Sequence, residues 1–488
     1  MIHGETHLRG IHPPQSQFHS RGRFGRLFPE LPSFAPDLPR IRAALIELGK
    51  QGGLMDANDP SPPPPAPNLN PDNEDITAGF TFFGQFVDHD LTFDPTSILE
   101  RQNDPEALEN FRTPALELDN IYGAGPRAAR HFYDTDNPAK FLLDVLSDAP
   151  GSQDDMPRNR QATAIISDPR NDENVIVSQF HVAMLKFHNA VVDHLIAKNV
   201  SPSEVFEEAQ RMVRWHYQWI VLKEFLPKIA GADVVRAVLQ APPRARFFQW
   251  RNEPFIPVEF SVAAYRFGHS QVRPGYRVNQ GFAAGIFNST IAADVADPND
   301  LRGGKRAQRR FVEWDLFFPI TGATRPAQQG KRIDSRLSSP LFALIQGAPG
   351  QVAGSGAGTA SNPVSLAQRN LLRSLALSLP SGQAMAKRMG IKPLTPDQLA
   401  DLKPLGVGFE LATPPWFYIL KEAEVNGGGK RLSGVGARIV AEVLIGILQG
   451  DRRSFLNANP DWKPELANSK GEFFIEDLLR FAGAKLGP

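Results

Sequence analysis

The chain has 488 residues, of which 41% are hydrophobic and 22% charged, with 40 glycines, 43 prolines and no cysteine. This apolar content is typical of a globular protein and excludes wholesale disorder. The 53 basic residues balance 53 acidic ones, so no overall basic field draws the chain to nucleic acid or anionic lipid. The absence of cysteine excludes disulfides, thiolate catalysis, iron–sulfur clusters and cysteine-based zinc sites.

No segment approaches the roughly 20 apolar residues that a membrane-spanning helix needs. The longest apolar run, residues 439–448, is short and carries Glu442. The N-terminal sequence MIHGETHLRGIHPP lacks the apolar core of a Sec signal peptide. We therefore expect a soluble protein, cytoplasmic or exported without a Sec signal.

Two regions follow from the composition along the chain. Residues 1–75 are rich in proline, glycine and polar residues and end in SPPPPAPNLNPDNED. This pattern predicts an irregular N-terminal arm that wraps a larger body, with a freely disordered tail as the alternative. Residues 76–488 form the predicted larger body, in which residues 350–362 (GQVAGSGAGTASN) are typical of a flexible linker or surface loop.

Helical spacing of apolar residues dominates the second region. From Thr77 the chain becomes apolar, and FTFFGQFV fits either a helix or a strand. Residues 175–198 repeat apolar side chains at helical spacing, and Pro202 opens a second long helix over residues 203–226. Further helices are expected over residues 257–272, 363–389, 413–424 and 436–450. Without internal repeats or sustained strand alternation, the sequence predicts a mainly α protein with a single large domain.

The segment GQFVDHD carries the first candidate site residues. On a helix, Gln85, Asp88 and His89 lie on one face, at positions i, i+3 and i+4. An amide, a carboxylate and an imidazole placed in this way could line one wall of a pocket. The alternative is an ordinary helix with a buried histidine that bonds to a neighbour, and these seven residues alone favour it.

Three more polar motifs sit at the ends or on the faces of predicted helices. DPRNDEN contains Asp168, Arg170 and Glu173; AYRFGHS contains Arg266 and His269; QRNLLRSLALSLP contains Asn370 and Arg373. Taken alone, each motif also fits an ordinary structural role: acidic residues at the start of a helix, or a buried histidine that hydrogen-bonds to a neighbour.

Three histidines on the long helix, His181, His188 and His194, suggest a metal site. No Glu-x-x-His pair or HExxH motif accompanies them, so we expect them to pack and to hydrogen-bond.

The order and spacing of these motifs resemble the animal-type haem peroxidases of the peroxidase–cyclooxygenase superfamily. The resemblance extends from about Phe80 to Gly390, and FGRLFPEL at residues 24–31 fits the usual start of the bacterial members. It implies a mainly α, single large haem-peroxidase domain with long loops and little strand. The haem b would lie between a distal and a proximal helix.

On the distal side, the resemblance assigns a role to each motif residue. His89 matches the distal histidine, Gln85 the distal amide near the peroxide and halide site, and Arg170 the distal catalytic arginine. Asp88 and Glu173 match the two carboxylates that form esters with haem methyl groups. Asn174 stands where a sulfonium-forming methionine occurs in one family member, so that third bond is not expected.

On the proximal side, His269 matches the haem iron ligand and Arg266 a partner of a haem propionate. Asn370 matches the asparagine whose carbonyl accepts a hydrogen bond from the proximal imidazole, and Arg373 a second arginine beside the haem.

The same resemblance implies a calcium site that pins the distal helix. Asp90 follows the distal histidine, and TPALELDNIYG matches the family's calcium loop. The implied ligands are Asp90, Thr113, the carbonyl of Ala115, Glu117 and Asp119. Glu117 and Asp119 replace the expected Asp and Ser, and they keep the hard oxygen ligands that Ca²⁺ prefers.

The implied activity is a haem peroxidase that reduces hydrogen peroxide and oxidises halides, pseudohalides or small aromatic donors. A fatty-acid oxygenase of the same superfamily is the main alternative. It needs a tyrosine three residues before the proximal histidine, where this chain has Arg266. The adjacent Tyr265 should point about 100° away on a helix.

Two non-peroxidase alternatives also remain: a non-catalytic haem-binding protein, and more remotely a metal-dependent phosphohydrolase suggested by the His89–Asp90 doublet. The sequence does not set the oligomeric state, although a disulfide-linked dimer is excluded.

Overall fold

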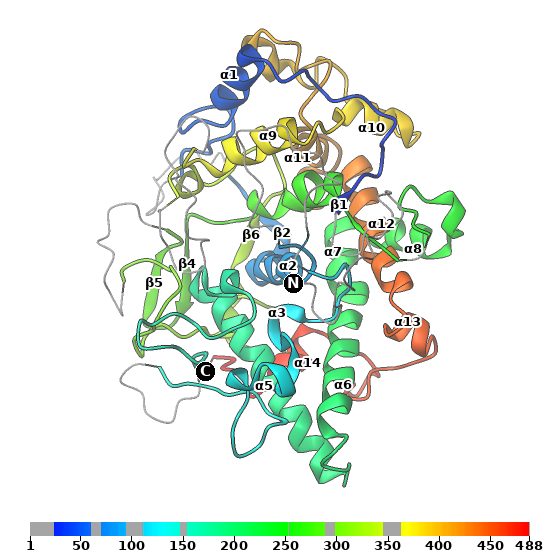
Figure 1. Cartoon of the computed structure of the whole chain (residues 1–488). Coiled ribbons are helices and arrows are strands. Elements are labelled where there is room, and N and C mark those ends of the chain that lie inside the picture. Colours follow the sequence, from blue (N-terminus) through cyan, green and yellow to red (C-terminus); the bar gives the residue numbers. More distant parts are fainter. Residues whose placement is uncertain are drawn as a thin grey trace.

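The computed structural model describes residues 24–59, 70–93, 110, 112–146, 154–251, 253–287, 298–344 and 363–487. Helices dominate this part of the chain, as expected for a mainly α protein (Figure 1). One hydrophobic cluster runs through it, from Phe24 to Ala482, so the described residues share a single core. The predicted linker at residues 350–362 lies outside the described residues.

The α-helices are α1 Pro39–Leu48, α2 Ala78–Leu91, α3 Asp119–Tyr122, α4 Gly125–Ala128, α5 Val175–Ala197, α6 Val205–Ile220, α7 Leu226–Ala230, α8 Ala232–Gln240, α9 Leu366–Ala376, α10 Gly382–Arg388, α11 Pro415–Gly427, α12 Gly434–Gly450, α13 Phe455–Ala458 and α14 Ile475–Phe481. The 3₁₀ segments are η2 Arg130–Phe132, η3 Pro169–Asp172, η5 Pro243–Ala245, η7 Ala264–His269, η8 Trp314–Leu316, η9 Ser339–Phe342 and η10 Ala400–Leu405. Two segments are π-helical, η4 Val221–Phe225 and η6 Glu259–Ala263.

Strands contribute little, and each described sheet has two of them. The strands are β1 Phe24–Gly25, β2 Asp72–Thr77, β3 Ile256–Pro257, β4 Gly275–Asn279, β5 Phe282–Gly285 and β6 Gln329–Lys331. β1 pairs with β3 in parallel, β2 with β6 antiparallel, and β4 with β5 as an antiparallel pair.

Helix α2 lies in the middle of the molecule, with α5 and α6 on one side and α9 and α11 on the other (Figure 1). All of its residues except Gln85 are buried, which is typical of a helix enclosed by protein on every face. Gly79 allows close packing, because a Cβ there would lie only 2.6 Å from the carbonyl oxygen of Phe317. The close packing of α2 therefore holds its polar side chains inside the protein.

Helix α5 packs against both α2 and α6. The side chain of Asn174 caps its first turn by accepting hydrogen bonds from the backbone N–H groups of Ile176 and Val177. Its length and apolar composition would suffice to cross a membrane, yet 83% of the relevant window is buried inside the protein. We therefore read α5 as a core helix.

The described part of the N-terminal arm, residues 24–59 and 70–75, is more ordered than the sequence suggested. Residues 39–48 form α1, which packs against α9, and Leu45 and Leu48 are fully buried. The buried carboxylate of Glu259 accepts hydrogen bonds from the backbone N–H groups of Leu27 and Phe28. The described part of the arm is thus fastened to the body by packing and by hydrogen bonds, and the expectation of an irregular arm is wrong for α1.

Two predicted helices differ from the observed ones. The helix expected over residues 363–389 is interrupted between α9 and α10, because Pro380 has no backbone N–H to donate and Ser381 starts a new helix as its N-cap. The helix expected over residues 257–272 is a π segment followed by a 3₁₀ segment. This change of winding alters which side chains face the centre of the molecule.

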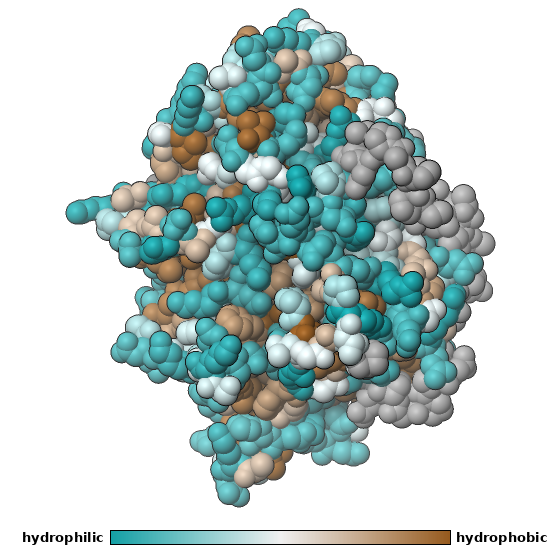
Figure 2. Space-filling view, turned by 180° about the vertical axis from the view of Figure 1, so that it is seen from behind, coloured by the Kyte–Doolittle hydropathy of each residue, from teal (hydrophilic) through white to brown (hydrophobic). Residues whose placement is uncertain are grey.

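Seen from behind, hydrophilic residues cover most of the surface, and hydrophobic residues are scattered among them (Figure 2). The large apolar side chains lie mainly in the core cluster described above.

Candidate active site

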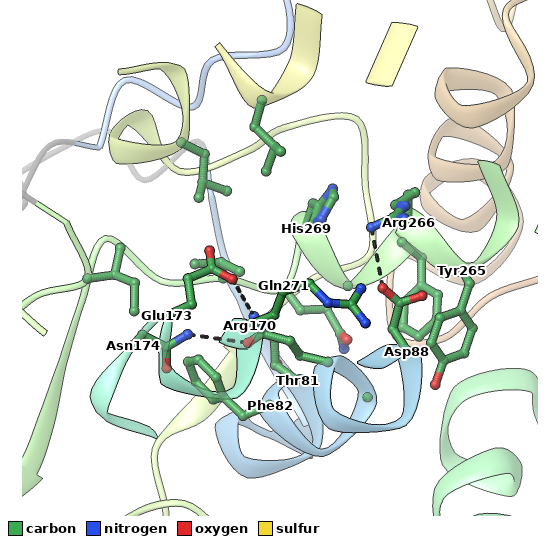
Figure 3. Close-up of a pocket in the computed structure, with 18 of the residues that line it drawn as sticks. Thr81, Phe82, Asp88, Arg170, Glu173, Asn174, Tyr265, Arg266, His269 and Gln271 are labelled. Atoms are coloured by element: carbon green, nitrogen blue, oxygen red, sulfur yellow. Dashed lines mark hydrogen bonds and ion pairs between the residues drawn. The ribbon is translucent and has the colours of Figure 1, made fainter. Parts of the chain in front are cut away.

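Residues from four separate segments of the chain meet around one internal cavity of about 270 Å³. Figure 3 shows Asp88 of α2 on one side, with Arg266 and His269 of η7 opposite. Eight of the nine predicted haem-side residues line this cavity: Gln85, Asp88, His89, Arg170, Glu173, Arg266, His269 and Asn370. The ninth, Arg373, lines a neighbouring cavity.

Gln85, Asp88 and His89 of α2 all line the cavity, as the helical spacing predicted. Asp88 accepts a hydrogen bond of 3.1 Å from the Thr92 hydroxyl and forms an ion pair of 3.5 Å with Arg266. This pair joins the distal helix to the segment that carries His269. Both walls of the cavity are therefore linked by a direct charge contact.

Arg170 is held by Asp168, whose role the sequence motif did not reveal. The Asp168 carboxylate accepts hydrogen bonds from Nε and Nη2 of Arg170, at 3.1 and 2.8 Å. The buried Arg112 also donates to Asp168, at 2.7 Å, and to the carbonyl oxygen of His89, at 3.3 Å. Burial would raise the pKa of Asp168, but these two guanidinium groups hold it well below its usual range. Asp168 therefore remains an anion that fixes the direction of Arg170.

His89 is buried, with Nδ1 lying 2.8 Å from Oδ1 of Asn171. Burial and the nearby cation of Arg170 lower its pKa to about 4, so the imidazole is neutral near pH 7. Because Asn171 occupies Nδ1, Nε2 is the ring nitrogen left for chemistry in the cavity. A neutral imidazole in this position can accept a proton.

Glu173 follows the short η3 segment and meets Gln85 across the cavity. Nε2 of Gln85 donates to Oε2 of Glu173 at 3.1 Å, and Nδ2 of Asn174 donates to Oε1 of Gln85 at 3.3 Å. Burial raises the pKa of Glu173, while Arg170 and Arg266 lower it. These bonds place the carboxylate at the cavity edge, away from Asp88 in Figure 3.

His269, on the other wall, is the predicted iron ligand. Burial and the charge of Arg266 lower its pKa to about 3, so this imidazole is neutral. Its ring makes an edge-on contact with Trp416, whose Nε1–H donates to the carbonyl oxygen of Arg266. Asn370 on α9 contacts Nδ1 at 2.8 Å. Asn370 is the residue that the sequence predicted to bond to this imidazole.

The orientation of the Asn370 amide differs from the expectation. The amide nitrogen, rather than the carbonyl oxygen, faces Nδ1 of His269. In this arrangement the amide donates, and the imidazole proton resides on Nε2. A half-turn about the Cβ–Cγ bond would bring the oxygen to Nδ1 and free Nε2 for a metal. Both orientations of the Asn370 amide form one hydrogen bond with Nδ1 of His269, each with a different tautomer of the imidazole.

A second cavity of about 250 Å³ adjoins the first. The two share Arg170, Arg266, Leu366 and Asn370 in their linings. Two further arginines, Arg369 and Arg373, also line the second cavity. Four guanidinium groups around one space suit a ligand with carboxylates.

Tyr265 lines the main cavity, contrary to the expectation that it points away. The π-to-3₁₀ change before η7 explains this, since a regular α-helical offset does not apply there. Its hydroxyl is buried without a hydrogen-bond partner in the described structure, and burial raises its pKa well above the usual value. Gln271 and Thr81 also line the cavity with unpartnered buried polar atoms.

The predicted calcium ligands are only partly gathered. Asp90 is completely buried. Within the described part of the chain, neither of its carboxylate oxygens has a hydrogen-bond partner, and Oδ2 of Asp119 has none either. Burial and the charge of Asp119 raise the pKa of Asp90, and burial with Glu117 raises that of Asp119 to about 7. Glu117 instead forms an ion pair with Arg453.

Thr113 and Ala115 are buried in the loop before α3. Within the described residues, no three His, Cys, Asp or Glu side chains converge as a ready metal site.

The three helical histidines confirm the packing interpretation. His181 bonds to Asn171, and Nδ1 and Nε2 of His188 contact the Tyr122 hydroxyl and the Ala139 carbonyl oxygen. His194 packs against Phe481.

The animal haem peroxidase family profile matches residues 100–302. Curated relatives include human thyroid peroxidase, 26% identical over 270 residues, and Drosophila melanogaster chorion peroxidase, 32% identical over 183 residues. These matches cover 49% and 36% of this chain, but only 27% and 21% of the relatives. The chain thus spans less than a third of the length of these two relatives.

Over residues 100–302 the chain is similar to the animal haem peroxidases. Solved structures show the same fold over nearly the whole chain. Peroxidase A from Dictyostelium discoideum aligns with a TM-score of 0.65 at 16% identity, covering 97% of this chain and 95% of that one. The fatty acid alpha-dioxygenase from Oryza sativa aligns with a TM-score of 0.59 at 14% identity, covering 96% and 80%.

The haem peroxidase profile includes Arg170, Glu173, Arg266 and His269, whereas the GQFVDHD segment precedes its first matched residue. The place of His89 therefore rests on the geometry of the cavity, where it lies with Arg170 and faces the wall that carries His269.

Proposed function

We propose that the protein is a haem peroxidase that uses hydrogen peroxide to oxidise halides, pseudohalides or small aromatic donors. The observation that carries this proposal is the placing of two sets of residues around one cavity: His89 and Arg170 on one wall, and His269 with Asn370 on the other. A base with a cation, facing a neutral imidazole that can bind a metal, is the set that peroxide cleavage needs.

The residues fit a haem b in the cavity. His269 would bind the iron through Nε2, with the Asn370 amide turned to accept the Nδ1 proton, which keeps the ligand closer to neutral than a carboxylate partner would. The arginines of the second cavity, Arg266 and Arg373 among them, would hold the propionates. When bound, the haem would supply the redox chemistry for the reduction of hydrogen peroxide.

The side chains on the distal wall supply the proton transfers. Nε2 of His89 takes the proton from one peroxide oxygen and returns it to the departing oxygen. Negative charge develops on the departing oxygen, and the Arg170 guanidinium, held by Asp168, stabilises that charge. Gln85 lies one helical turn before His89 on α2 and also lines the cavity, where its amide can hydrogen-bond to a small anion or to peroxide.

Asp88 and Glu173 would link the haem covalently as esters, since both carboxylates line the cavity from different segments. Each carboxylate oxygen would replace one hydrogen of a haem methyl group in a two-electron oxidation, with hydrogen peroxide as the oxidant and water as its product. After treatment of the haem-loaded protein with peroxide, we expect haem to stay with the polypeptide during acid–organic extraction. Single D88N and E173Q variants should release more haem, and the double variant all of it. Complete extraction from the peroxide-treated wild type would contradict the ester roles.

Calcium would bind near Asp90 and Asp119, because three buried carboxylate oxygens there have no hydrogen-bond partner among the residues that the structure describes. Thr113, the Ala115 carbonyl and Glu117 would complete the site, with Glu117 released from Arg453. We expect one bound Ca²⁺ per chain. At 100 times its dissociation constant, calcium should stabilise folding by about 2.7 kcal/mol. Metal analysis and thermal unfolding, with and without a chelator, measure this.

The control for calcium is the D90N variant, which should lose both the bound metal and the response to chelator while its haem content is measured in parallel. Removal of calcium should also disturb the haem absorption spectrum, because Asp90 directly follows His89. An unfolding temperature and spectrum that ignore verified metal removal would contradict the site.

A fatty-acid oxygenase is the second candidate. The observation that favours it is Tyr265, which lines the cavity and whose buried hydroxyl has no hydrogen-bond partner among the described residues. Against it, Arg266 occupies the position three residues before His269. Peroxide-dependent oxidation of iodide or a phenol, measured beside oxygen uptake with a polyunsaturated fatty acid, separates the two. Donor oxidation without oxygen uptake supports the peroxidase; the reverse, abolished by Y265F, would replace it.

A further inference from the structure

Asn171 lies between two buried histidines, and no motif assigned it a role. Its Oδ1 is 2.8 Å from Nδ1 of His89, and its Nδ2 is 3.0 Å from Nδ1 of His181. All three side chains are at least 96% buried. His89 comes from α2 and His181 from α5, so the amide joins the distal wall of the cavity to the core helix behind it.

The two ends of the Asn171 amide make different hydrogen bonds to the two imidazoles. Its carbonyl oxygen only accepts a hydrogen bond and its NH₂ group only donates. The histidine on the oxygen side must present Nδ1–H, and the histidine on the nitrogen side must present a bare Nδ1. A neutral imidazole carries one ring proton, on Nδ1 or on Nε2. The two rings must therefore be opposite tautomers.

We propose that Asn171 is a positioning residue that holds His89 as the Nδ1–H tautomer, with Nε2 bare toward the cavity, and that His181 fixes the orientation of the amide by accepting its N–H. The inference deepens the proposed function, because proton acceptance by His89 depends on a bare Nε2. A turned amide would donate to Nδ1 of His89 and move the ring proton to Nε2, where it blocks acceptance of the peroxide proton.

NMR of the full chain labelled with ¹⁵N-histidine identifies the tautomer of each ring. Two samples are measured: the protein without haem, and the protein loaded with diamagnetic zinc protoporphyrin IX. Signals that vanish in H89Q and H181Q assign the two rings. We expect His89 to be protonated on Nδ1 and His181 on Nε2. Protonation of His89 on Nε2, or the same tautomer in both rings, would overturn the proposal.

Two substitutions separate the acceptor from the donor half of the amide. N171D keeps an acceptor for His89, so its Nδ1–H signal should persist. N171L has neither half, and His89 should become a mixture of tautomers. N189L is the matched control, because Asn189 bonds only to the backbone of Phe141. An unchanged His89 signal in N171L would overturn the proposal.

The kinetic counterpart uses haem-loaded protein and hydrogen peroxide. N171L should react about 10- to 100-fold more slowly than wild type, whereas N171D should stay within a few-fold. Wild-type rates in N171L would overturn the positioning role. If the wild type itself does not react with peroxide, the proposed function fails, but the NMR result still decides the tautomers.

Discussion

The H89L variant is expected to react with hydrogen peroxide about 10²- to 10⁴-fold more slowly than the wild type, because a positioned proton acceptor contributes a factor of that size. His89 lines the cavity, is neutral, and has only Nε2 left for the peroxide proton. Haem content should change little, since His269 on the opposite wall is intact. Stopped-flow absorbance of the haem-loaded variant after mixing with peroxide measures the rate.

A matched control for this variant is H194L, which removes a histidine from the far end of α5, beside Phe481. It should react like the wild type. If H89L also reacts at the wild-type rate while holding a full complement of haem, His89 is not the proton acceptor and the distal assignment is wrong.

The H269A variant is expected to lose the histidine-ligated absorption spectrum and to lower peroxidase activity by more than about 100-fold. Changes to the partners of a metal ligand commonly cost 10- to 100-fold, and loss of the ligand itself should cost more. Haem affinity should fall as well, since the arginines of the second cavity would be its main remaining contacts. Haem titration followed by absorbance gives both quantities.

Added imidazole provides the control for H269A, because it can occupy the space that the side chain leaves and restore iron ligation. Partial recovery of the spectrum and of activity would show that the protein still folds. A variant with the unaltered wild-type spectrum before imidazole is added would mean that another residue binds the iron.

Much of the candidate site could be predicted from the sequence because its residues fall in short motifs with fixed spacing. Helical geometry alone placed Gln85, Asp88 and His89 on one face, and the cavity bears this out. The spacing from Asp168 to Glu173 likewise placed a cation and a carboxylate together before a long helix. Local rules suffice where the relevant residues are three or four positions apart.

Contacts between distant segments could not be predicted in this way. Arg112 meets Asp168 across 56 residues, and nothing in either neighbourhood marks the pair. Asn171 stands within the recognised DPRNDEN segment, yet its two partners lie on α2 and α5. These bonds depend on how whole helices pack.

Departures from regular helical winding account for the other differences. Tyr265 reaches the cavity because residues 259–269 are wound first as π and then as 3₁₀ helix, and periodicity assumes a regular α-helix. Pro380 breaks a run whose composition is otherwise helical. The arm contains α1 because its apolar face finds α9 to pack on, which composition alone does not show.

The most direct test of the haem peroxidase site is a haem titration of the full chain, followed by one equivalent of hydrogen peroxide with the Soret band recorded throughout. We expect one haem per chain, a histidine-ligated spectrum, and a rapid spectral change whose rate rises with peroxide concentration. Absence of stoichiometric haem binding, or a loaded protein whose Soret band does not respond to peroxide, would contradict it.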